Sequence, residues 1–140
     1  MMLRALTIED WPEAEALYWE LTASGAVAGR DAFAAVLNHV GTSVYGQVQD
    51  SALLAMATLH ILPNMTYAGR PYALIENVVA AKATRGQGHG KAVMKHCIAQ
   101  AQAAGCYKVM LLTGEARKAR GFYEAVGFSS DEKHGMIIRL

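Results

Sequence analysis

The sequence predicts a single α/β domain with the element order β-α-α-β-β-β-α-β-α-β. Its 140 residues suffice for one hydrophobic core and are too few for two ordinary domains. Slightly more than half of the residues (53%) are apolar, so the chain can bury enough surface to fold. From residue 72 onward, strand-like and helix-like patterns alternate, which is typical of strands joined by helical crossovers. We therefore expect one α/β domain over residues 1–140.

The first third of the chain predicts one strand and two helices. A short strand is expected over residues 3–7. Asp10 is expected to cap the helix that follows, because Glu13 stands three residues later as in a capping box. A second helix is expected over residues 31–40, after the connection SGAVAGR (residues 24–30), whose small residues and glycines favour mobility.

Changes of periodicity define the remaining elements. Two β-rich runs, residues 42–49 and 52–62, are separated only by Asp50 and Ser51, so a hairpin is the economical interpretation. A loop then precedes the next strand. The other predicted elements are a loop at 64–70, a strand at 72–81, a helix at 88–104, a strand at 109–112, a helix with an apolar stripe over 116–126 and a strand at 136–140. Gly127 is expected to end the last helix in the left-handed conformation.

Charge and composition argue against several classes of partner. Thirteen basic and twelve acidic side chains nearly cancel, which predicts no nucleic acid partner and no anionic membrane surface. No segment has the roughly 18 uncharged apolar residues of a membrane span, and the N-terminus does not resemble a signal peptide. Cys97 and Cys106 lack a disulfide pattern, so we expect reduced thiols and a cytoplasmic, soluble protein. The five histidines have no metal-ligand spacing, so no metal is expected.

The most informative segment is VVAAKATRGQGHGKAVM, residues 78–94, which predicts a strand, a glycine loop and a helix start. Glycines free backbone N–H groups, and the first turn of a helix has unpaired donors, so this arrangement binds anions such as a pyrophosphate. A P-loop is excluded because Arg85 and Ala92 stand where it needs Gly and Ser or Thr. A dinucleotide fingerprint is excluded because Lys91 or Val93 stands where its third glycine belongs.

Two motifs carry a resemblance to a known family. Arg85-x-x-Gly88-x-Gly90 resembles the pyrophosphate loop of the GNAT N-acetyltransferases, and GFYEAVGF, residues 121–128, is similar to the last helix of that family. The resemblance covers essentially the whole chain and implies a mixed central sheet with helices on both faces. It also implies acetyl-CoA as co-substrate. The residues implied to bind acetyl-CoA are Val78, Val79, Ala80, Arg85, Gly86, Gln87, Gly88, His89, Gly90 and Lys91.

Two positions depart from the family pattern. Ala116 stands where the family often has an asparagine, so a side-chain contact to the CoA arm is expected to be missing. His89 stands where the family usually has an aliphatic or aromatic residue. Neither departure changes the backbone donors of the glycine loop.

Glu76 and Tyr123 are the candidate catalytic residues. Glu76 interrupts an otherwise apolar strand, which is costly for a carboxylate unless it is paired, hydrated or on a wet face. It is therefore either a general base for the incoming amine or a carboxylate that is paired or faces solvent. By resemblance, Tyr123 is the general acid for the departing thiolate, to which a phenol with a pKa of about 10 is suited. The alternative is a packed aromatic ring.

The resemblance implies direct transfer of an acetyl group to a primary amine of a small molecule or peptide. The alternative is a catalytically idle acyl-CoA-binding or regulatory module of the same fold. The acceptor is expected in a cleft formed by the first two helices and the loop before the strand at 72–81, and a homodimer is possible because domains of this family are often dimers. The sequence does not identify the amine.

Overall fold

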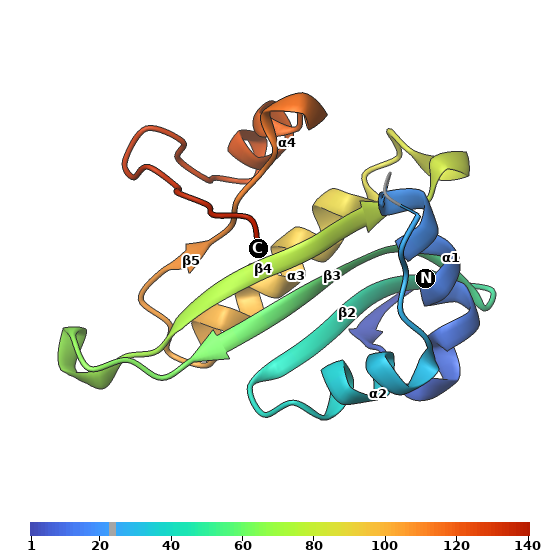
Figure 1. Ribbon diagram of the computed structural model, residues 1–140, viewed down its shortest axis with the longest axis horizontal. Coiled ribbons are helices and arrows are strands. Elements are labelled where there is room, and N and C mark those ends of the chain that lie inside the picture. Colours follow the sequence, from blue (N-terminus) through green and yellow to red (C-terminus); the bar gives the residue numbers. More distant parts are fainter. Residues whose placement is uncertain (23–24) are drawn as a thin grey trace.

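The computed structural model describes residues 1–22 and 25–140, which form one mixed sheet flanked by helices (Figure 1). Within these residues the sheet has five strands in the order β1-β2-β3-β4-β5. The strands are β1 (Met2–Ala5), β2 (Thr42–Gln49), β3 (Ala52–Leu62), β4 (Tyr72–Ala80) and β5 (Val109–Met110). The first four pair antiparallel with their neighbours, whereas β5 pairs parallel with β4. The predicted α/β class and the mixed sheet are confirmed.

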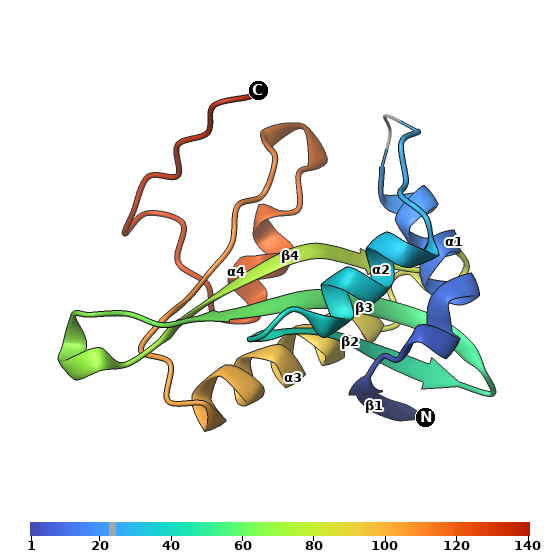
Figure 2. The same ribbon diagram turned by 60° about the horizontal axis from the view of Figure 1, so that its bottom comes forward.

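Helices cover both faces of this sheet (Figure 2). They are α1 (Trp11–Leu21), α2 (Arg30–Asn38), α3 (His89–Ala103) and α4 (Arg120–Ala125). The helices α1 and α2 pack with Val44, Met56 and Val79 in one buried cluster. The helix α3 packs against the opposite face, where Leu59 and Ile75 are buried. The helix α4 lies along the β5 side of the sheet.

The β2–β3 hairpin has the bounds that the sequence predicts. Its two turn residues, Asp50 and Ser51, have φ angles of 49° and 67°. Two successive positive φ angles are typical of the two-residue turns whose twist matches that of paired strands. The hairpin and the strand β4 form the antiparallel centre of the sheet, on which the candidate site is built.

The predicted cap at the start of α1 is wrong in detail. Asp10 makes no side-chain hydrogen bond as the N-cap of α1. Its carboxylate instead accepts hydrogen bonds from Arg4 Nη1 and Nη2, both at 2.8 Å, and from the Thr7 backbone N–H at 2.8 Å. A short 3-10 turn (Ile8–Asp10) precedes α1, and Thr7 is its N-cap. The bidentate contact with Arg4 therefore joins β1 to the start of α1.

The predicted strand at residues 136–140 is not present in the sheet. These residues have no regular secondary structure, and their large apolar side chains are exposed, with Met136 91% and Ile138 83% exposed. The neighbouring strand β5 is two residues long, shorter than the predicted 109–112. So short an edge leaves few N–H and C=O groups against which a sixth strand could pair.

The last helix, α4, is also shorter than the apolar stripe that predicts it over residues 116–126. A 3-10 turn (Glu115–Arg117) precedes α4, and Lys118 between them has a φ of 52°, outside the right-handed helical range. Gly127 has a φ of 107°, so the predicted helix end is confirmed. The predicted SGAVAGR connection begins at Ser24, which lies outside the described residues. Among the described helices, none has the length and hydropathy of a membrane span.

Candidate active site

The glycine loop lies between the end of β4 and the start of α3. Gly86 and Gly88 have φ angles of 81° and 86°, and a Cβ added to either would meet no atom within 4 Å. Gly88 is the N-cap of α3 and offers no side chain to the first turn. The buried hydroxyl of Thr84, just before the loop, has no hydrogen-bond partner among the described residues. Unpaired donors beside open space fit an anionic group.

Arg85, Gln87 and Lys91 surround this loop and are exposed. The guanidinium of Arg85 donates from Nε to the backbone oxygen of Ala80 at 3.3 Å, which holds it at the end of β4. Both basic side chains thus flank the loop at its exposed surface, where they can approach a phosphate.

His89 does not share that exposure. It is the first residue of α3 and only 8% exposed, and its Nδ1 lies 3.0 Å from Nε2 of the buried Gln47 on β2. The imidazole thus packs beneath the sheet and anchors α3, while its backbone N–H remains in the first turn. Only this backbone group fits the acetyl-CoA contact expected of His89.

The strands β4 and β5 separate beside the glycine loop. They pair only at Ala73 with Val109 and at Leu74 with Met110. Beyond Leu74, the β5 side of β4 has no strand partner within the described part of the chain. Val78, Val79 and Ala80 lie in this open stretch, so backbone groups of the strand can contact an extended ligand there.

Glu76 lies on β4 opposite Thr58 of β3 and is exposed. The sequence left open a general base, a paired carboxylate or one that faces solvent, and the strand is not buried at this point. The next residue, Asn77, has a φ of 52°, and the register between β3 and β4 shifts here. Glu76 therefore faces solvent and avoids the cost of desolvation.

Tyr123 on α4 is half-buried against the core. Its ring contacts Phe122 and Phe128 edge-on, with ring centroids 5.0 Å and 6.2 Å away. Its hydroxyl has no hydrogen-bond partner among the described residues. Burial raises the pKa of the Tyr123 phenol, the charge of Arg117 lowers it, and the carboxylate of Glu76 raises it further. The charge of one candidate catalytic residue thus acts on the pKa of the other.

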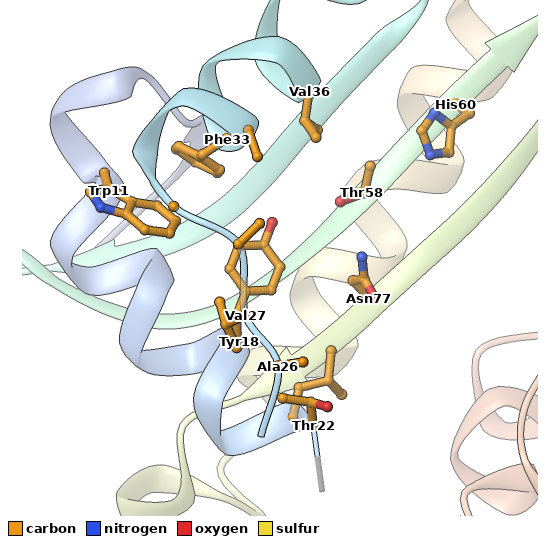
Figure 3. A pocket seen from close by; sticks show the side chains of 14 residues that line it. Trp11, Tyr18, Thr22, Ala26, Val27, Phe33, Val36, Thr58, His60 and Asn77 are labelled. Carbon is orange, nitrogen blue, oxygen red and sulfur yellow. The ribbon is translucent and has the colours of Figure 1, made fainter. Parts of the chain in front are cut away.

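A pocket of about 350 Å³ lies between α1, α2 and the β3–β4 pair (Figure 3). The first two helices line it as the sequence predicts. The loop before β4 does not, because Arg70 binds the backbone oxygens of Gly105 and Cys106 and Tyr67 stacks on Tyr107.

Three polar residues on the strand side of the pocket could not be singled out in the sequence. They are Thr58, His60 and Asn77. Two of them stand at alternate positions of the apolar run ALLAMATLHIL, a period-two pattern that places both on one face of a strand. This alternation is the feature of the sequence that indicates a polar wall on one side of the pocket. No group of three metal-ligating side chains is found in the part of the chain that the structure describes.

A family model described as "Acetyltransferase (GNAT) family" matches residues 3–128. The chain belongs to this acetyltransferase family. The match covers the glycine loop, both candidate catalytic residues and the pocket. The predicted family is therefore confirmed, although the role of each residue is not tested by this match.

Individual relatives agree with the family. A glucosamine 6-phosphate N-acetyltransferase of Trypanosoma brucei brucei is 36% identical over 92 residues, which are 66% of this chain and 61% of that protein. The chain thus matches less than two thirds of the length of this relative. A solved structure from Agrobacterium tumefaciens str. C58 has a TM-score of 0.94 and 41% identity, with all of both chains covered. The crystal structure of a Trypanosoma brucei acetyltransferase has a TM-score of 0.85 and 30% identity, with 99% of both chains covered.

Proposed function

We propose that this chain transfers the acetyl group of acetyl-CoA to the primary amine of a small molecule or peptide by direct attack. The observation that carries the proposal is the free edge of β4 beyond Leu74, which runs into the glycine loop. An extended thioester can lie along the strand while its pyrophosphate binds the loop. The relative that acetylates a sugar amine supports a small-molecule acceptor.

The binding roles follow from exposure and position. Backbone groups of Val78 to Ala80 orient the pantetheine arm and the thioester carbonyl. Backbone N–H groups from Gly86 to Gly90 hold the pyrophosphate, and the exposed Arg85 and Lys91 add charge. Most of the acceleration comes from holding two substrates in reacting geometry and polarising the carbonyl.

The proton transfers fall to Glu76 and Tyr123. An ammonium acceptor gives a proton to the Glu76 carboxylate, directly or through water, and the free amine nitrogen attacks the carbonyl carbon. The carbon–sulfur bond then breaks and the sulfur takes the phenol proton of Tyr123. The nitrogen of the new amide gives up its second proton, which restores the phenol. Because the pKa of Tyr123 is raised, the phenol carries this proton throughout the neutral range.

Thiol release decides between an enzyme and an idle acyl-CoA-binding module. The protein is incubated with acetyl-CoA and a panel of amines, and free CoA thiol is measured beside the acetyl-CoA dissociation constant. An enzyme releases thiol only with an acceptor and yields the acetylated amine. Tight acetyl-CoA binding without thiol for any amine would instead establish the idle module.

Glu76→Gln tests whether Glu76 acts as the general base. We expect kcat/KM to fall by about 10² to 10⁴ and the acidic limb of the pH profile to flatten, while the acetyl-CoA Kd stays near that of the parent. Glu132→Gln is the matched control, because Glu132 is an exposed carboxylate that does not line the pocket. A pH profile that keeps its shape in Glu76→Gln would remove Glu76 from catalysis.

We propose that two copies of the chain associate through the C-terminal segment 136–140. Its sequence MIIRL is apolar and β-prone, yet Met136, Ile137 and Ile138 are 91%, 66% and 83% exposed. The two-residue edge strand β5 has free backbone groups on its outer side. Sedimentation of the parent should give a dimer, and removal of residues 136–140 should give a monomer; a monomeric parent contradicts the proposal.

We also propose a cytoplasmic location. Cys97 and Cys106 are free and buried, and burial raises the pKa of the Cys97 thiol to about 12. Such thiols persist in a reducing compartment. Protein isolated from its native source should contain two free thiols after denaturation, and an oxidised pair would oppose this location.

A further inference from the structure

The pocket between α1, α2 and the β3–β4 pair has no charged side chain among its described lining residues. Its described lining consists of Trp11, Tyr18, Leu21, Thr22, Ala26, Val27, Ala28, Gly29, Ala32, Phe33, Val36, Thr58, His60 and Asn77. A phosphate taken from water into such a place requires arginine or lysine donors, and a second ammonium requires a carboxylate or an open aromatic face. The lining provides neither an arginine, a lysine nor a carboxylate.

One wall of the pocket is aromatic and preorganised. Phe33 on α2 is 3% exposed and lies between two rings of α1, with its centroid 5.4 Å from that of Trp11 and 6.3 Å from that of Tyr18. The rings pack on one another, so their edges and the neighbouring Val36 present an apolar surface (Figure 3). This wall fits the flat or apolar body of a ligand better than a second cation.

The facing wall is polar but neutral, and other residues hold its groups in place. Burial raises the pKa of the Tyr18 phenol, and the nearby Thr58 hydroxyl lowers it. Nδ1 of His60 lies 2.8 Å from Oγ1 of the buried Thr42, which in turn lies 2.9 Å from Nδ1 of His39. These bonds fix the His60 ring and leave only its Nε2 for a ligand.

Asn77 completes the polar wall. Its side-chain amide has no hydrogen-bond partner within residues 1–22 and 25–140. Its positive φ of 52° is uncommon for a residue other than glycine and turns the amide out of the strand pattern, toward the pocket (Figure 3). An amide and an imidazole nitrogen on one wall match a ligand hydroxyl, which both donates and accepts.

We infer that the acceptor is a monoamine with an uncharged, largely apolar or ring-shaped body that carries a hydroxyl group. This inference rests on the proposed acetyl transfer and narrows its acceptor. It separates the chain from its glucosamine 6-phosphate-acetylating relative, because a phosphorylated acceptor would place a dianion in a lining without a cation. A polyamine would place a second ammonium in a lining without a carboxylate.

Four acceptors test the inference with the parent protein. They are tyramine, phenylethylamine, glucosamine 6-phosphate and spermidine, and kcat/KM is measured for each by thiol release. We expect the two monoamines to exceed the two charged acceptors by about tenfold or more, with tyramine above phenylethylamine. A higher kcat/KM for glucosamine 6-phosphate or spermidine than for tyramine overturns the inference while it supports acetyl transfer. Absence of thiol with all four amines, despite acetyl-CoA binding, counts against the proposed function itself.

Ala32→Arg tests whether the lack of a cation in the pocket lining is what disfavours a phosphorylated acceptor. Ala32 lines the pocket from the exposed side of α2, so a long side chain there can be accommodated. We expect kcat/KM for glucosamine 6-phosphate to rise by about tenfold relative to the neutral control Ala32→Gln, with no rise for tyramine. Equal values for the phosphorylated acceptor in both variants would show that the acceptor body binds elsewhere.

Discussion

Glu76 and Tyr123 lie on separate elements, β4 and α4, yet the carboxylate helps to raise the pKa of the phenol. Burial of the ring is the larger cause, and Arg117 opposes both. A phenol with a raised pKa keeps its proton at neutral pH, while an exposed carboxylate can exchange protons with water. The two residues are therefore suited to opposite roles, the carboxylate as a proton acceptor and the phenol as a proton donor.

Tyr123→Phe separates the catalytic interpretation of this residue from the packing interpretation. Because the hydroxyl has no described partner, its removal should leave stability within about 1 kcal/mol of the parent. We expect kcat to fall by about 10² or more with acetyl-CoA affinity nearly unchanged, and the loss to shrink for an acyl donor with a better leaving group.

Tyr45→Phe is the control, because Tyr45 packs against the same core cluster from β2. It should keep parental kcat. If Tyr123→Phe turns over like the parent with every donor, the acid is a water or another residue.

At the scale of elements, two connections hold the site together. The glycine loop sets the start of α3 against the end of β4, and the Arg4–Asp10 contact sets β1 against the start of α1. Both depend on short stretches in which backbone conformation or charge, rather than apolar packing, fixes the geometry. Each can therefore be perturbed without opening the core.

Gly88→Val should abolish acetyl-CoA binding while the fold persists. A β-branched residue is strained at a φ of 86°, and its side chain would occupy the open space in front of the α3 N-terminus. Gly105→Val imposes similar strain at a φ of 83° beyond the other end of α3, also in open space. Calorimetric titration should show binding in Gly105→Val alone; parental affinity in Gly88→Val would exclude the loop as the phosphate site.

Asp10→Asn should lower the free energy of unfolding by about 1 kcal/mol at pH 7. The hydrogen bond with Arg4 is the main cause of the lowered pKa of Asp10, and the Thr7 N–H contributes. A lowered pKa means that this contribution is complete above the unfolded value of about 3.9 and is lost as the pH falls through the folded value. Urea titrations from pH 7 to pH 3 should therefore show the two proteins converging in acid. A pH-independent difference would assign the effect to packing.

The sequence predicts the boundaries of several elements well because the signals for these boundaries are local. The turn at Asp50 and Ser51, the glycines before α3 and the glycine after α4 each set a boundary within one or two residues. The missing last strand and the exposure of Glu76 depend on pairing at a distance, namely the length of β5 and the register shift between β3 and β4. Local propensity carries no information about these partners.

The same limit applies to the site. The glycine loop could be predicted because a single segment contains it. The full lining of the pocket could not, because Trp11, Phe33, His60 and Asn77 come from four elements that only the fold brings together. The burial of the His89 side chain could not be predicted, because its partner, Gln47, is 42 positions away.

At the scale of the whole molecule, amide hydrogen exchange should be slowest at the centre of the sheet. The strands β2, β3 and β4 have long registers on both sides of β3, whereas β5 is held by two residue pairs. We expect amides of β3 to exchange slowest and those near Val109 fastest among the strands. Acetyl-CoA should slow exchange in the loop and the β4 edge more than in β1, and uniform slowing would contradict a ligand site at that edge.

The sheet order β1-β2-β3-β4-β5 follows the chain, which has a consequence for how the protein folds during synthesis. The β2–β3 hairpin and its pairing with β4 involve neighbouring segments, so the antiparallel centre can form while the ribosome is still adding α3. The gap between β4 and β5 exists only after the α3 crossover has docked and β5 has paired. A nascent chain would therefore gain the proposed acyl-donor site last, and acetyl-CoA bound there would stabilise the part of the molecule that forms latest.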